Sequence, residues 1–91
     1  PKSPYLPLAL YWSGNCKYAN KEYAGAISQL QNLIKRYPNH SRIPAAMVTL
    51  GSSQLESGNK AAAKKTFNEI IAKYPNTDAA KDAQQLITAT K

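Results

Sequence analysis

The tripeptide YPN stands at residues 37–39 and again at residues 74–76, which is 37 positions further along a chain of 91 residues. When the whole sequence is shifted by 37 positions, 11 of the 54 overlapping pairs (91 − 37) are identical, Gly14 with Gly51 among them. Unrelated sequences of average composition would share about three. A period of roughly 20 to 50 residues is the mark of a repeat architecture. The YPN stretch therefore predicts two copies of one structural unit.

Between these breaks, apolar residues recur at intervals of three and four positions, which is the spacing of one face of an α-helix. The stretch from Tyr23 to Tyr37 shows this most clearly, with Ala26, Leu30 and Leu33 on a single stripe. No stretch carries the signal of a strand. The sequence therefore predicts an all-α fold, with helices over about residues 6–19, 23–37, 42–57, 60–74 and 78–89.

The expected helix ends carry residues that favour helix termini. The side chains of Ser41, Asn59 and Thr77 can accept hydrogen bonds from the free amides that begin the next helix. Gly58 stands where a left-handed residue closes a helix at the lowest cost. Lys21 occupies the equivalent place in the first unit, so we expect a strained left-handed lysine there.

Small residues, large apolar residues and prolines recur at matching places in both units: Gly14 and Gly51, Ala26 and Ala63, Leu30 and Phe67, and Pro38 and Pro75. This arrangement resembles the tetratricopeptide repeat, whose helix pairs stack into a right-handed solenoid. The resemblance implies a single domain over residues 1–91, with repeat one at about 5–38, repeat two at about 42–75 and a C-terminal capping helix at about 77–90, five helices in all. Pro1 corresponds to Pro38, so we expect the chain to be the C-terminal piece of a longer protein.

Three stretches narrow the resemblance: ALYWSGN at residues 9–15, YPNH followed by AAM between residues 37 and 47, and KYPNTDAAKDAQ at residues 73–84. They are similar to the C-terminal domain of the CpoB (YbgF) family. That resemblance implies a periplasmic protein of the Tol-Pal system that binds TolA during cell division. It also implies coupling of peptidoglycan synthesis, by a bifunctional penicillin-binding protein, to outer-membrane constriction. The full-length family protein has a signal peptide and an N-terminal coiled coil that trimerises. Ser13 and Lys17 depart from the family pattern.

In the tetratricopeptide family, the first helices of successive units line a concave groove. The resemblance places its residues on the first, third and fifth helices: Leu8, Tyr11, Asn15, Tyr18, Ala45, Val48, Ser52, Leu55, Asp82 and Gln85. Spacings of three and four positions put each set on one helix face. Tyrosine combines a large apolar area with a hydroxyl group, which is typical of a peptide anchor. The alternative is that Tyr11 and Tyr18 pack only between neighbouring first helices.

The sequence shows no catalytic or metal-binding set. His40 and Cys16 are the only residues of their types. We expect His40 to be a turn residue, and Cys16 to be buried and inert where a neighbouring unit packs. No apolar run approaches the ~20 residues of a membrane span, so we expect no membrane insertion. The sequence indicates a non-catalytic protein-interaction domain without a cofactor.

The charge favours acidic partners, because 12 basic residues outweigh five acidic ones and leave a net charge of +7. Several of the basic residues fall on the second helix of each pair, on the expected convex side: Lys35, Arg36, Lys64, Lys65 and Lys73. Nucleic-acid binding calls for basic residues interleaved with exposed aromatic ones, so we expect no nucleic-acid partner. Two alternatives stay open. One is a scaffold of another envelope assembly that resembles the outer-membrane assembly lipoprotein BamD, and the other is a basic nucleic-acid adaptor.

Overall fold

The computed structural model describes residues 6–90. These residues form five helices: α1 (Leu6–Ala19), α2 (Tyr23–Arg36), α3 (Ile43–Glu56), α4 (Lys60–Lys73) and α5 (Asp78–Thr90). Each helix begins and ends within one residue of its predicted bounds, and the described part of the chain has no strand. The predicted all-α fold is confirmed, whereas the expectations for residues 1–5 and 91 lie outside the described residues.

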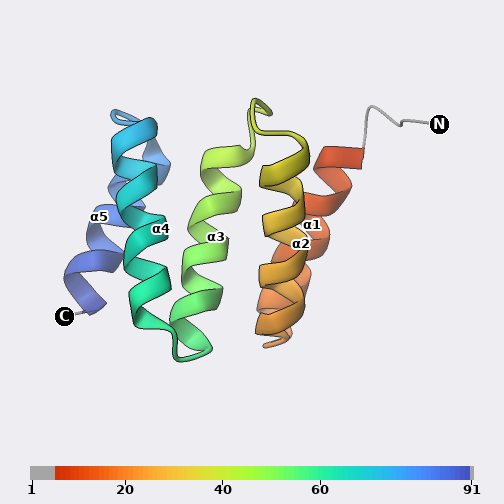
Figure 1. Ribbon diagram of the computed structural model, residues 1–91, viewed down its shortest axis with the longest axis horizontal. Coiled ribbons are helices and arrows are strands. Elements are labelled where there is room, and N and C mark those ends of the chain that lie inside the picture. The colour runs from red at the N-terminus through yellow and green to blue at the C-terminus, as the bar shows by residue number, and fades with distance from the viewer. Residues whose placement is uncertain (1–5, 91) are drawn as a thin grey trace.

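The helices stand side by side in chain order, with α1 behind α2 and α5 behind α4 in the view of Figure 1. α1 pairs with α2, and α3 pairs with α4, while α5 packs against α4. The central helix α3 also contacts α1, α2 and α5. Because α1 and α5 both reach α3, these three helices share one side of the molecule. None of the helices within residues 6–90 has both the length and the apolar character that a membrane crossing requires.

A glycine lets the two helices of each pair approach closely. A Cβ atom added to Gly14 would lie 2.6 Å from Cγ of Leu30, and one added to Gly51 would lie 2.8 Å from Cδ1 of Phe67. Both of these large side chains are fully buried. A small residue therefore lies opposite a large one in both helix pairs.

The turns between paired helices have the same geometry. Lys21 and Gly58 both have a positive φ, at 65° and 95°. In each turn, the amide one residue later donates a 2.8 Å hydrogen bond to the carbonyl five residues before it. This is the pattern of a left-handed helix end, which glycine adopts most easily. Lys21 is thus the strained residue that the sequence predicts, and Asn76, with a φ of 69°, is another left-handed residue in the described chain.

Two of the three predicted helix caps are present. Asn59 Oδ1 accepts a hydrogen bond from the amide three residues on, at 3.1 Å, and Thr77 Oγ1 accepts one over the same span, also at 3.1 Å. The prediction for Ser41 is wrong, because the cap position of α3 falls on Arg42. Instead, His40 Nδ1 accepts a hydrogen bond from the Arg42 amide at 3.1 Å. His40 is therefore a turn residue, as expected.

Candidate functional site

The predicted groove residues lie on the three helices that share one side of the molecule. We call this surface the first-helix face and define it by Leu8, Tyr11, Asn15, Tyr18, Val48, Ser52, Leu55 and Gln85, with Ala45 and Asp82 beside them. The residues on α1 and α3 are half-buried, whereas Gln85 and Asp82 on α5 are exposed. The fold thus places all of them on first helices, and the local contacts show which of them meet.

Tyr11 belongs to an aromatic and basic cluster. Its ring meets the Trp12 ring edge-on, with 5.1 Å between centroids. The Arg42 guanidinium lies over both rings, 5.6 Å from the Tyr11 centroid and 5.9 Å from the Trp12 centroid. Such cation–π contacts stabilise exposed sites by about 0.5–1 kcal/mol each. Trp12 is 51% exposed, so the cluster presents a large apolar surface beside Tyr11. No pattern in the sequence indicated Arg42 at this place.

Asn15 carries a buried acceptor without a donor. Its Oδ1 atom is shielded from solvent and has no hydrogen-bond partner. An unpaired buried acceptor costs about 1–3 kcal/mol, and most such atoms in native proteins are paired. Asn15 lies four positions after Tyr11 and three before Tyr18, so helical spacing puts the three on the same side of α1. Because the protein's own atoms shield this oxygen, a partner's N–H group would reach it only once the Asn15 side chain has turned outward.

Tyr18, near the end of α1, has neighbours on both α2 and α3. Its ring lies 5.8 Å from that of Tyr23 in α2, centroid to centroid. Burial raises the pKa of the Tyr18 hydroxyl above its ordinary value of 10.0, and the nearby Glu56 and Tyr23 raise it further. The neighbouring Ser52 hydroxyl acts in the opposite direction. Tyr18 and Ser52, both predicted groove residues, are therefore brought together, and Tyr18 also packs between neighbouring helices.

A hollow of about 380 Å³ lies between α3 and α5. It is lined by Val48, Asp82, Gln85, Leu86 and Ala89. Three of these residues were predicted groove residues, whereas Leu86 and Ala89 were not. They lie one and four positions after Gln85, so their helical spacing from Gln85 on α5 could have predicted that they line the hollow. The hollow has room for one apolar side chain, with polar groups at its edge.

Ser13 and Lys17 on α1 face α2. Gln29 Nε2 donates a 3.1 Å hydrogen bond to Ser13 Oγ. The stem of Lys17 runs over Gly25, where an added Cβ atom would lie 3.0 Å from Lys17 Cδ. Both side chains are therefore accommodated between α1 and α2.

The expectation for Cys16 is wrong, because its side chain is exposed. It shares the outer side of α1 with Trp12, four positions earlier, which is also exposed. Within the described residues, α1 packs only against α2 and α3, so no helix covers this side. The same part of the chain holds no group of three or more His, Cys, Asp or Glu side chains that could bind a metal ion.

A stack of helix pairs with one continuous first-helix face defines a helical-repeat domain of the kind that binds other proteins. The tetratricopeptide repeat family matches residues 17–87 of this chain. The chain belongs to that family, whose domains are interaction modules that typically lack catalytic activity. Comparison with curated proteins gave no significant match.

Proposed function

We propose that the first-helix face binds an extended segment or a helix edge of a protein partner, with Tyr11 and Tyr18 as anchors. The observation that carries this proposal is the unpaired Oδ1 atom of Asn15, which stands between them on α1. An extended polypeptide offers backbone N–H groups, and one of these would satisfy the amide oxygen once the Asn15 side chain has turned towards the surface. Binding would thus remove the free-energy cost of the unpaired Asn15 acceptor. It would also cover the side chains of Tyr11 and Tyr18, and both effects favour association.

The hollow between α3 and α5 extends this binding surface. Val48 lines it from α3 and Gln85 from α5. In the 37-residue register, Tyr11, Val48 and Gln85 occupy equivalent places on successive first helices. A partner that runs across α1, α3 and α5 would therefore meet an aromatic side chain, then an apolar hollow, then an amide.

The partner that we propose is TolA, in the periplasm, where the domain would help to coordinate peptidoglycan synthesis with outer-membrane constriction during division. A bifunctional penicillin-binding protein would be a further member of the same assembly. Support comes from the ALYWSGN and KYPNTDAAKDAQ stretches, which are similar to the CpoB family. By the same resemblance, the full-length protein would trimerise through a coiled coil upstream of this domain.

Calorimetric titration with the purified periplasmic part of TolA, at low and high salt, tests the proposal. Saturable binding that survives high salt is expected. Salt screens the attraction between charges, and the contacts of the Tyr11 and Tyr18 anchors are largely apolar. Absence of binding at both salt concentrations would contradict the choice of TolA. Binding that high salt removes would contradict the first-helix face as the site and would move the contact to the basic second helices.

A further inference from the structure

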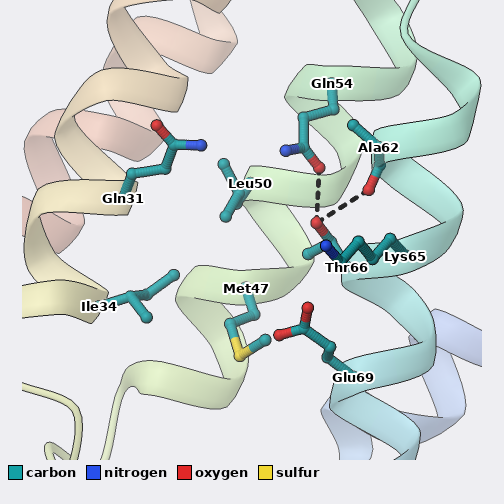
Figure 2. A pocket seen from close by; sticks show the side chains of 9 residues that line it. All are labelled: Gln31, Ile34, Met47, Leu50, Gln54, Ala62, Lys65, Thr66 and Glu69. Carbon is teal, nitrogen blue, oxygen red and sulfur yellow. Dashed lines mark hydrogen bonds between the residues drawn. The ribbon is translucent and has the colours of Figure 1, made fainter.

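A second hollow lies on the other side of α3, between α2 and α4. We call it the second-helix hollow. It has a volume of about 330 Å³ and is lined by Gln31, Ile34, Met47, Leu50, Gln54, Ala62, Lys65, Thr66 and Glu69. Figure 2 shows Gln31 and Ile34 on the α2 side, Met47 and Leu50 on α3 between the walls, and the α4 residues opposite. The first-helix face shares none of these residues.

The floor of the second-helix hollow is aliphatic. Met47 and Leu50 are 5% and 6% exposed, and Ile34 is half-buried beside them. Methionine is unbranched and flexible, so it adapts to side chains of different shape. A leucine or methionine side chain from a partner would find apolar atoms there on three helices.

A buried polar pair stands at the edge of this floor. Thr66 Oγ1 lies 2.7 Å from Gln54 Oε1 and 3.0 Å from the Ala62 carbonyl oxygen. Gln54 and Thr66 are 8% and 7% exposed. The amide nitrogen of Gln54 points away from Thr66, towards the α2 side in Figure 2. Its N–H groups can therefore donate to a carbonyl group of a polypeptide in the hollow.

The charge of the two sides of the molecule differs sharply. α2 and α4 carry six basic side chains and one acidic one, Glu69. α1, α3 and α5 carry two basic and three acidic ones. Among residues 6–90, no salt bridge neutralises the lysines of α2 and α4. An acidic partner is therefore attracted to the side of the second-helix hollow and not to the first-helix face.

We propose that the second-helix hollow is a second docking site, for an acidic polypeptide segment with one leucine-sized apolar side chain. That side chain packs on Met47 and Leu50, a backbone carbonyl accepts a hydrogen bond from Gln54 Nε2, and flanking carboxylates meet Lys65. Polypeptide is favoured over nucleic acid because no aromatic side chain lines the hollow on which a base could stack. This site is independent of the proposed role of the first-helix face.

The test is an NMR titration of the ¹⁵N-labelled domain with two synthetic peptides rich in glutamate. One peptide carries a central leucine, and the other has alanine in its place. The leucine peptide is expected to shift the side-chain amide signals of Gln54 and Gln31 saturably. The alanine peptide should bind about tenfold more weakly, because it loses most of the apolar contact.

Paired variants localise the site. Ala62→Leu fills the hollow and should abolish the Gln54 shift, whereas Ala61→Leu, one position away on an exposed side of α4, should leave it unchanged. Lys65→Glu should weaken the peptide about tenfold, whereas Lys81→Glu makes the same charge change on α5 and should have little effect. Lys65 is exposed, so this variant keeps the test valid if Ala62→Leu fails to fold.

Three results would overturn the proposal: no shift with either peptide, equal binding of the leucine and alanine peptides, or shifts confined to α1, α3 and α5. A short single-stranded oligothymidine that shifts the Gln54 signal when the peptides do not would also overturn it, in favour of nucleic acid. The residues of the first-helix face give separate NMR signals. The titration therefore shows a lack of binding at one site independently of binding at the other.

Discussion

Gly51 in α3 lies against the ring of Phe67 in α4, so closely that an added Cβ atom would stand 2.8 Å from Cδ1 and 2.9 Å from Cζ. The ring is fully buried. The first helix pair repeats this relationship with Gly14 and the flexible side chain of Leu30. The close approach of the two helices in each pair thus depends on a glycine. In the second pair, this approach sets the position of α3, which contributes side chains to the first-helix face and to the second-helix hollow.

Gly51→Ala should lower the free energy of unfolding by about 2 kcal/mol, because a rigid ring must move to admit the methyl group. Alanine has the better helix propensity, which stabilises the variant by about 1 kcal/mol. The expected loss stated above already includes this gain. Urea denaturation followed by circular dichroism measures the change. In a Phe67→Leu background the same substitution should cost less, since leucine can rotate. An alanine variant as stable as the parent would contradict the packing account.

The left-handed turns give a reciprocal pair of predictions. Lys21→Gly should raise the free energy of unfolding by about 1 kcal/mol, because glycine adopts a φ of 65° without strain. Gly58→Ala should lower it by a similar amount, about 1 kcal/mol, for the opposite reason. No side chain would be crowded at Gly58, where an added Cβ meets nothing within 4 Å. A Lys21→Gly variant that is less stable than the parent would contradict the account of the turn.

The raised pKa of Tyr18 makes stability depend on alkaline pH. The unfolded tyrosine ionises near its ordinary value of 10.0, before the folded one does. The stabilising contribution is therefore complete below that pH and is lost as the pH rises through the folded-state pKa. Urea denaturation between about pH 8 and about pH 11 should show a smaller decline for Tyr18→Phe than for the parent. Identical declines would contradict the assignment.

The exposed position of Cys16 predicts that its thiol is accessible in the folded protein. A chromogenic disulfide reagent should modify it in native buffer at a rate within about tenfold of the rate in denaturant, since access and not unfolding controls the reaction. Modification that proceeds only at the rate of global unfolding would restore the original expectation of a buried residue.

The fold followed from local signals in the sequence. The stripe through Leu30 and Leu33 and the cap residues Asn59 and Thr77 each act within one turn or one helix. The 37-residue period repeats this local pattern in the second helix pair. The Ser41 cap failed because it depended on the start of α3 to the exact residue, and helix ends are the least certain part of such a prediction. The Cys16 prediction failed because it required a neighbour that the described chain does not provide.

The site was less accessible to sequence reasoning, because contacts between helices decide it. The positions of Tyr11 and Tyr18 on a first helix could be predicted, but their neighbours could not. Arg42 reaches the Tyr11 ring from beyond a loop, and Glu56 affects Tyr18 from another helix. The second-helix hollow depends on how far apart α2 and α4 stand, which no local pattern encodes.

The most direct test of the central claim compares the parent domain with a Tyr11→Ala, Tyr18→Ala double variant in calorimetric titrations with the periplasmic part of TolA. Circular dichroism first establishes that the variant is folded, and Tyr74→Ala serves as a matched control on the YPN turn. The first-helix face account predicts saturable binding by the parent and the control, and binding by the double variant that is at least about tenfold weaker. A folded double variant that binds as tightly as the parent would contradict it.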